Sequence, residues 1–416
     1  MPGFLLGLLA LGHCMAFADR SLPAVAAPLL KASLGLSDTQ LGLLDGPAFV
    51  ALYVVGMLAS WPMARSRHRL YLAAGCIGSW VAGMLLFAVG TEIGVLVAGR
   101  ALMGLGQAAY IPLALGLIVE QAAPLQRGRT MAVFTAASVV GRGAALLAGG
   151  ALLAMLVRWA PAMAHTHWRL LFLLMTGPNL VLMLLLLTYR EPPQWAPAAP
   201  PKHFAGILAT VRERPGLVAA YLCVAAASVL VTQTLGAWAP SVLQREHGLS
   251  PGTAAFTFGA ALLVASPLGH FLAGTLVDRR SPRLTPLAIA AGALALVVPL
   301  MRLLPEASSA FAACGLLALA SLAGGTAAVA ALAGLPQMLS GAARDAGLRL
   351  FLAFVTVVGA GLGPLMAGVV SDQLGAGGSG LSEALFDVCA AAGAVGIAAA
   401  AVASRSWRRA VAGVTG

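Results

Sequence analysis

Long apolar stretches separated by short polar gaps fill almost the whole chain. A helix that crosses a bilayer needs about 20 mostly apolar residues. Twelve stretches meet this length, over residues 3–31, 39–63, 69–90, 92–121, 128–156, 168–189, 216–242, 252–277, 284–304, 308–339, 348–371 and 381–404. The pattern therefore predicts an all-α membrane protein with twelve transmembrane helices.

A polar segment rich in proline divides these stretches into six before it and six after. It begins with Glu191-Pro192-Pro193 and contains a second run of prolines before Lys202. Such a composition is typical of a linker. We expect an N-terminal six-helix bundle over residues 1–190, a cytoplasmic linker over 191–215 and a C-terminal six-helix bundle over 216–416, which is the layout of transporters built from repeated bundles.

The basic residues in the gaps predict the orientation, because cytoplasmic loops carry the excess of Lys and Arg. With a cytoplasmic N-terminus, the outer gaps contain only Lys31, Arg158, Arg169, Arg245 and Arg302. The cytoplasmic gaps then contain Arg65, Arg67, Arg69, Arg127, Arg129, Arg190, Lys202, Arg212, Arg214, Arg279, Arg280, Arg283, Arg344, Arg349, Arg405, Arg408 and Arg409. We therefore expect a multi-pass protein of the inner (cytoplasmic) membrane with both termini in the cytoplasm.

The composition excludes several other classes of protein. Only 9% of the 416 residues are charged, whereas soluble domains carry about a quarter. The net charge of +11 forms no basic stripe with interleaved aromatic residues, so no nucleic-acid partner is expected. The five cysteines lie singly in apolar stretches, which predicts neither disulfides nor a metal site. No nucleophile elbow or phosphate loop is present, so we expect no enzyme and no cofactor.

Several motifs resemble those of the major facilitator superfamily and, within it, the spinster-type transporters. The matching pieces are Ala18-Asp19-Arg20, Gly99 to Pro112, Trp168-Arg169, Arg190 to Pro193, Trp238 to Pro240, Gly274 to Arg280, and Gly361 to Pro364 with Ser371-Asp372. They run through nearly the whole chain in the expected order. The resemblance implies the major facilitator fold, alternating access and a monomer. Eukaryotic spinster-type proteins export sphingosine phosphate or lysophospholipids.

The resemblance also implies which residues act. In that fold the first and fourth helices line a central cavity, so Asp19, Arg20, Arg100 and Gln107 are expected to face it. The implied substrate-binding and coupling set is completed by Tyr110 and Trp238, and the implied gating set is Gly274, Asp278, Arg279 and Asp372. Arg142 joins the binding set for a different reason, since it is a charge in the middle of an apolar stretch where related sequences usually have a small residue.

The chain departs from the family pattern at two positions. Gln107 stands where spinster-type proteins usually carry the Glu that is expected to couple protons, and a Gln side chain cannot titrate. Ala64 stands in place of the Asp of the first-half loop motif. Asp19 is then the acid to which we assign any proton coupling. If Asp19 stays paired with an Arg throughout, the protein is instead an uncoupled facilitator or exchanger.

The intramembrane charges leave alternatives open, because a charge at bilayer depth needs water or a partner. Asp19 and Arg100 either act in transport or form a structural ion pair. Arg142 and Asp45 lie at similar depth, so they either pair or leave Arg142 as a further anchor for an anion. Glu120 lies near a cytoplasmic helix end, where a gate or cap role is expected.

The second half of the chain has no Lys, Arg, Asp or Glu in the central portions of its apolar stretches. A cavity with one charged and one apolar wall suits an amphipathic anion, so secondary transport of a lipid-like anion is the favoured function. Small organic anions and cationic or neutral drugs are the alternative solutes. A non-transporting sensor and a lipid scramblase are the alternative functions.

Overall fold

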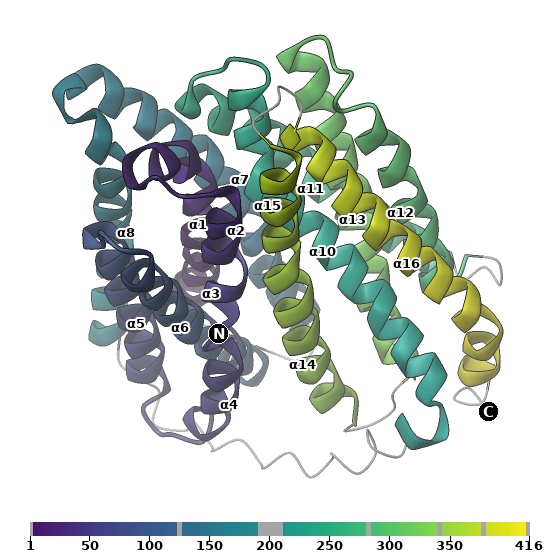
Figure 1. Ribbon diagram of the computed structural model, residues 1–416. Coiled ribbons are helices and arrows are strands. Elements are labelled where there is room, and N and C mark those ends of the chain that lie inside the picture. Colours follow the sequence, from purple (N-terminus) through teal and green to yellow (C-terminus); the bar gives the residue numbers. More distant parts are fainter. Residues whose placement is uncertain are drawn as a thin grey trace. The chain divides into compact units, whose positions relative to one another are not determined.

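The computed structural model of the protein describes residues 3–122, 127–189, 211–279, 284–338, 343–375 and 380–412 (Figure 1). Within these ranges the secondary structure is helical and contains no strand. Eleven of the described helical stretches are long and apolar enough to cross a bilayer, and α12 (Pro286–Arg302) is a shorter apolar helix of 17 residues. The predicted all-α membrane fold is confirmed, and each predicted apolar stretch coincides with a helical one.

The contacts between Cα atoms divide the chain into two compact units. Unit 1 comprises Met1–Ala199 and Gly248–Leu263, and unit 2 comprises Pro200–His247 and Val264–Gly416. Helix α11 (Pro251–Asp278) therefore begins in unit 1 and ends in unit 2. Most of the predicted linker, residues 191–210, lies outside the described residues.

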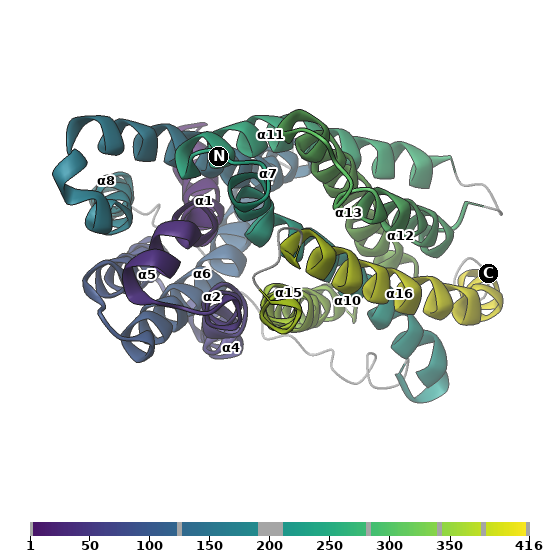
Figure 2. The same ribbon diagram turned by 45° about the horizontal axis from the view of Figure 1, so that its top comes forward.

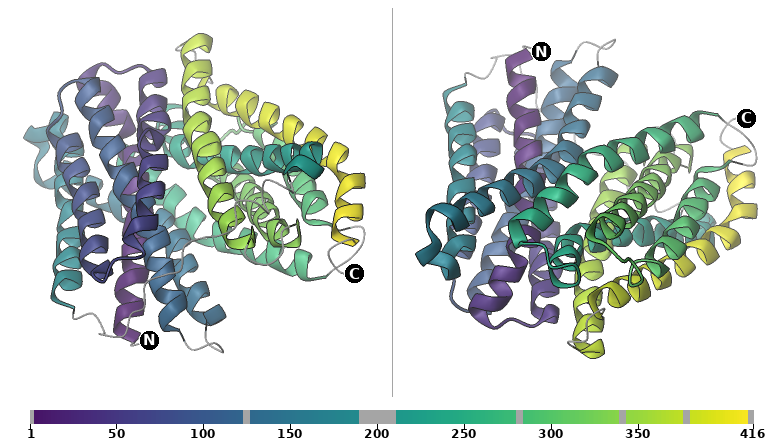
Figure 3. Two further views of the ribbon diagram at one scale, coloured as in Figure 1. Left: turned by 90° about the horizontal axis from the view of Figure 1, so that it is seen from below. Right: turned by 90° about the horizontal axis from the view of Figure 1, so that it is seen from above.

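Unit 1 is a bundle in which the long helices run side by side (Figures 2 and 3). The closest neighbours are α5 with α6 and α1 with α7. Its helices are α1 (Gly3–Leu34), α2 (Asp38–Asp45), α3 (Pro47–Val50), α4 (Tyr53–Met63), α5 (Arg69–Val89), α6 (Ile93–Gln121), α7 (Arg127–Trp159), the short 3-10 helix η2 (Pro161–Thr166) and α8 (His167–Thr188).

Unit 2 is a second bundle. Besides α12, its helices are α10 (Pro215–Arg245), α13 (Ala310–Met338), α14 (Ala343–Val355), the π-helix η3 (Thr356–Ala360), α15 (Gly361–Leu374) and α16 (Gly380–Ala412). Helix α10 packs against α16, and α12 packs against both α13 and α16. The π-helix lies one turn before Pro364, whose nitrogen carries no hydrogen for the usual helical bond.

The second predicted span is broken rather than continuous, which corrects the expectation of one helix over 39–63. Its start is well defined, because Ser37 and Gln40 form a reciprocal capping box at the first turn of α2. The helix then ends at Asp45, where Gly46 adopts φ −100° and ψ −93°, and Pro47 opens α3. Gly followed by Pro permits this break, because Gly tolerates the unusual dihedral angles and Pro donates no hydrogen bond.

Small residues let the helices of unit 1 approach closely. A Cβ atom built on Gly83 of α5 would lie 2.5 Å from the carbonyl oxygen of Gly99 of α6. A Cβ on Gly104 would overlap the carbonyl oxygen of Phe49, so α3 rests directly on α6 at this glycine. Close backbone approach at glycine is a main source of helix association in membranes. The broken span is thereby fixed against α6.

We predict that Gly104→Ala lowers stability, because the backbone carbonyl of Phe49 cannot move aside as a flexible side chain would. The expected loss is about 1–3 kcal/mol, typical of overpacking, and is measured as a lower melting temperature in detergent. Gly116→Ala on the same helix is the matched control, since a Cβ there meets nothing within 4 Å. Gly116→Ala should hold or raise the melting temperature; equal behaviour of both variants would contradict the close contact.

Candidate functional site

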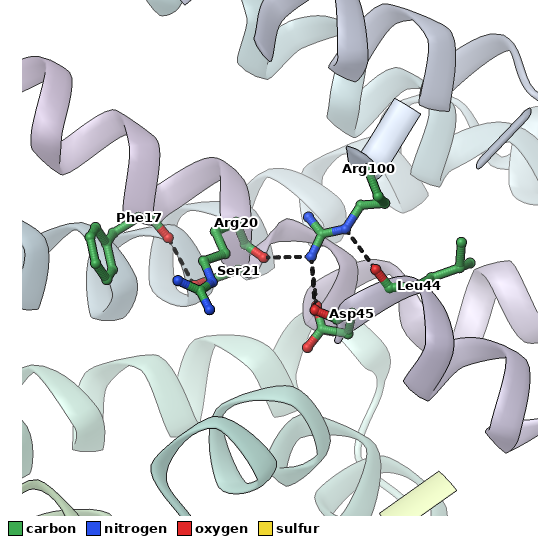
Figure 4. Close-up of polar contacts among 6 residues, drawn as sticks. All are labelled: Phe17, Arg20, Ser21, Leu44, Asp45 and Arg100. Carbon is green, nitrogen blue, oxygen red and sulfur yellow. Dashed lines mark hydrogen bonds and ion pairs between the residues drawn. The ribbon is translucent and has the colours of Figure 1, made fainter. Parts of the chain in front are cut away.

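The guanidinium of Arg100, on α6, is fully buried at the break between α2 and α3 (Figure 4). Its Nε donates to the carbonyl oxygen of Leu44 at 2.9 Å. Its Nη2 donates to the carbonyl oxygen of Asp45 at 3.3 Å, to the Asp45 carboxylate at 3.1 Å, and to the carbonyl oxygen of Arg20 at 3.5 Å. Three backbone carbonyls and one carboxylate therefore surround this single cation.

These carbonyls are available because α2 stops there. The last carbonyl groups of a helix have no partner within it, and together they carry a partial negative charge. Arg100 bonds two of them, those of Leu44 and Asp45, and so caps the C-terminus of α2. The break in the second span and the burial of Arg100 are consequently one arrangement.

Two more guanidiniums lie around the Asp45 carboxylate. That of Arg20, on α1, lies 4.5 Å from the centroid of the Phe49 ring and 6.0 Å from that of Phe17. That of Arg142, on α7, lies 5.9 Å from the Phe17 ring. The charges of Arg20, Arg100 and Arg142 all act on Asp45. We call these three arginines, with Asp45, Phe17 and Phe49, the arginine cluster.

Members of the arginine cluster differ in exposure. Arg100 is fully buried, whereas the Asp45 side chain keeps 18% of its surface exposed. Arg20 and Arg142 are half-buried. The exposed part of the arginine cluster therefore consists of one carboxylate and two guanidiniums. The two guanidiniums are the groups that can donate charge-assisted hydrogen bonds to an anion.

Asp19 lies in a separate polar contact within unit 1. The Asn179 side chain of α8 donates from Nδ2 to the Asp19 carboxylate at 2.8 Å and accepts at Oδ1 from the Trp80 indole at 3.0 Å. Asp19 is fully buried, and its Oδ1 has no hydrogen-bond partner in the described part of the chain. The ion pair between Asp19 and Arg100 that the sequence left open does not form, because Arg100 bonds Asp45 instead. Sequence reasoning missed Asn179, although an Asn in the middle of an apolar span is itself a signal of a polar contact.

The other predicted residues of α6 lie inside unit 1. Gln107 is buried, and within the described ranges its Nε2 has no hydrogen-bond partner. Tyr110 is also buried, donates to the carbonyl oxygen of Leu9 at 3.0 Å and stands edge-on to the Trp80 ring. Tyr110 thus ties α6 to α1, whereas Gln107 presents an unbonded amide in the interior.

The predicted residues of unit 2 are placed as follows. Trp238 is buried, and its indole donates to the carbonyl oxygen of Pro364 at 3.0 Å, which joins α10 to α15. Asp278, Arg279 and Asp372 are exposed, and Gly274 is half-buried with open space around its Cβ position.

Glu120, at the cytoplasmic end of α6 in the predicted orientation, pairs with the buried Arg69 of α5 at 2.6 Å. This ion pair joins the ends of two neighbouring helices. Within the described ranges no group of three or more His, Cys, Asp or Glu side chains could hold a metal ion.

Comparison with known proteins shows which family and which relatives the chain is similar to. The sequence model described as Major Facilitator Superfamily matches residues 9–364. A protein of Mycolicibacterium smegmatis named MFS-type efflux pump is 29% identical, over 97% of this chain and 92% of its own length. Human protein spinster homolog 1 is 29% identical over 67% of this chain, and the match spans 55% of the human protein.

Solved structures agree in fold. The crystal structure of a bacterial homolog to the human lysosomal transporter Spinster, inward-facing and unoccupied, superposes with a TM-score of 0.83, 24% identity and 98% coverage of both chains. A D-xylose–proton symporter superposes with a TM-score of 0.71, 17% identity and 95% coverage of both. The predicted fold of two six-helix bundles is confirmed by these similarities.

We predict that Arg100→Lys destabilises the protein although it keeps the charge. A lysine offers no planar fork, so it cannot bond the Leu44 and Asp45 carbonyls together. The expected loss is about 1–3 kcal/mol, read as a lower melting temperature in detergent. Arg302→Lys is the control, because Arg302 is exposed and pairs only across one turn with Glu306; its effect should stay within about 0.5 kcal/mol. Equal losses in both variants would show that Arg100 does not cap α2.

Proposed function

The chain belongs to the Major Facilitator Superfamily, and from this premise we propose that it is a secondary transporter that moves an amphipathic anion by alternating access. Members of this superfamily carry small molecules across membranes, and the chain has the matching set of apolar spans. The proposed location is the cytoplasmic membrane, with both termini in the cytoplasm and the chain acting as a monomer.

The observation that carries the proposal is the excess of positive charge in the arginine cluster. Three guanidiniums surround a single carboxylate, and the half-buried pair, Arg20 and Arg142, stacks on aromatic rings. A net positive charge at bilayer depth is costly, so an anion that joins the arginine cluster is strongly favoured. The apolar central portions of the C-terminal spans favour a solute that also carries an apolar tail.

Coupling to protons through Asp19 is the second part of the proposal. Asp19 is fully buried against Asn179, so a proton reaches it only when alternating access opens the contact between α1 and α8. Gln107 supplies no second titrating group on α6. In this scheme Gly274, Asp278, Arg279 and Asp372 act in gating, and Tyr110 and Trp238 support the binding helices.

The alternative function is uncoupled export or exchange of drug-like molecules or small organic anions. The relative from Mycolicibacterium smegmatis supports this alternative, because it is named an efflux pump and matches nearly the whole chain. The charge of the preferred solute separates the two functions, since the arginine cluster repels cations.

We predict that purified protein in liposomes transports dodecanesulfonate faster than benzenesulfonate, and both faster than dodecyltrimethylammonium. The sulfonate head bears a permanent negative charge for the guanidiniums, and the dodecyl chain supplies the apolar tail. Uptake of radiolabelled solutes measures the order of rates. Arg142→Gln should slow dodecanesulfonate uptake about tenfold, as the loss of one charged hydrogen bond implies, whereas Arg302→Gln should leave it unchanged. Preference for the cation would favour the drug-export alternative.

We predict that Asp19→Asn abolishes accumulation driven by a pH gradient while retaining downhill exchange. The amide can still accept the hydrogen bond from Asn179 but cannot take up a proton. Accumulation of dodecanesulfonate in liposomes with and without an imposed gradient measures the effect. Asp38→Asn is the matched control, because Asp38 pairs with Lys31 at the end of α1, at 2.5 Å, apart from the arginine cluster. Wild-type uptake that ignores the gradient would remove proton coupling altogether, and gradient-driven accumulation by Asp19→Asn would assign it to another acid.

A further inference from the structure

Asp45 is the acidic member of the arginine cluster, and the proposed transport mechanism gives it no role. Its carboxylate is the anionic side chain on which Arg20, Arg100 and Arg142 all act. It stands at the last residue of α2, directly before the break at Gly46.

The carboxylate of Asp45 is held less firmly than the guanidinium it bonds. Arg100 keeps the carbonyl oxygens of Leu44, Asp45 and Arg20 as acceptors whether or not the carboxylate is present. The carboxylate contributes one oxygen to Arg100, at 3.1 Å, and retains 18% exposure. Moving the carboxylate away therefore breaks one ion pair but leaves the cap on α2 intact.

A second observation indicates that the site can accept another anion. Nη1 of the fully buried Arg100 has no hydrogen-bond partner among the residues that the structure describes. Buried guanidinium nitrogens are normally bonded, and each unbonded one is costly. An anion with two or three oxygens that replaced the Asp45 carboxylate could bond Nη1 as well as Nη2.

The half-buried arginines complete this site. Arg20 and Arg142 lie beside the two aromatic rings of the arginine cluster. The rings attract the cations by their faces. The charges of all three arginines act on the Asp45 carboxylate, so an anionic head that takes its place meets the same three positive charges.

We propose that the Asp45 carboxylate is a resident counter-ion that occupies the place of the solute's anionic head, and that the solute displaces it from the arginine cluster on binding. This inference rests on the proposed function, because it assumes an anionic solute. It explains why an acid stands among three arginines in a site for anions: the carboxylate balances charge in the empty transporter. The solute then binds against an internal competitor, which limits its affinity and favours its release.

The test compares binding of dodecanesulfonate to full-length wild type, Asp45→Asn and the control Asp38→Asn in detergent. Asn removes the charge of the competitor and keeps its size. Asp45→Asn should bind about tenfold more tightly than wild type, as the loss of one competing hydrogen bond between charged groups implies. Asp38→Asn should bind like wild type. The substitution should also lower the melting temperature of the empty protein, and dodecanesulfonate should restore it.

Each outcome decides the matter. Equal affinity of wild type and Asp45→Asn, or a lost melting temperature that dodecanesulfonate does not restore, would overturn the displacement while leaving the proposed function standing. Binding by Asp45→Asn alone would support the displacement. Binding by neither protein would overturn both proposals. If Asp45→Asn is recovered folded only when dodecanesulfonate is present throughout purification, the anion replaces the carboxylate and the inference holds. Failure to fold in its presence as well, repeated with Asp45→Ser, would show that the carboxylate is an indispensable structural group.

Discussion

The hydrogen bonds from Arg100 to the end of α2 are the interaction on which the interior of unit 1 depends. A membrane-spanning helix that breaks exposes carbonyl groups that water cannot satisfy at that depth. In this protein the guanidinium of α6 satisfies two of those carbonyls. The negative end of the helix in turn compensates the buried cation. Neither the break nor the buried charge is stable alone, and each makes the other possible.

The position of α3 follows from the same arrangement. Once α2 has ended at Asp45, the chain turns at Gly46 and sets the Phe49 backbone directly on Gly104, one helical turn beyond Arg100. The Phe49 ring then lies near both Arg20 and Arg100. One short break therefore places a carboxylate, an aromatic ring and two guanidiniums within contact of one another. This grouping of polar side chains at a discontinuous helix is how many transporters form binding sites at mid-membrane.

The sequence predicted the spans well because length and apolar composition alone decide whether a helix can cross a bilayer. It also singled out the charges that form the arginine cluster, since Arg20, Arg100, Arg142 and Asp45 are conspicuous in apolar stretches. It did not predict their partners. Spacing along α6 places Arg100 on a face of its own helix, but the rotation and depth of α1 and α2 decide whether Asp19 or Asp45 meets it. The Gly46-Pro47 pair was the signal in the sequence for a break in the second span. The prediction missed this break because it assigned one continuous helix to each apolar stretch.

The two acids of unit 1 discussed above, Asp19 and Asp45, lie in separate polar contacts for a physical reason. Asp19 and Arg20 are neighbours in sequence, and successive residues of a helix point about 100° apart. When Arg20 reaches the aromatic rings of the arginine cluster, Asp19 must point elsewhere, and it meets the amide of Asn179. Asn179 is itself fixed by Trp80, so the acid is held by a neutral amide rather than by a cation. The first helix thereby directs Arg20 toward the arginine cluster and Asp19 away from it. If the arginine cluster binds an anion as proposed, that anion meets no repulsion from Asp19, and Asp45 is the acid that it displaces.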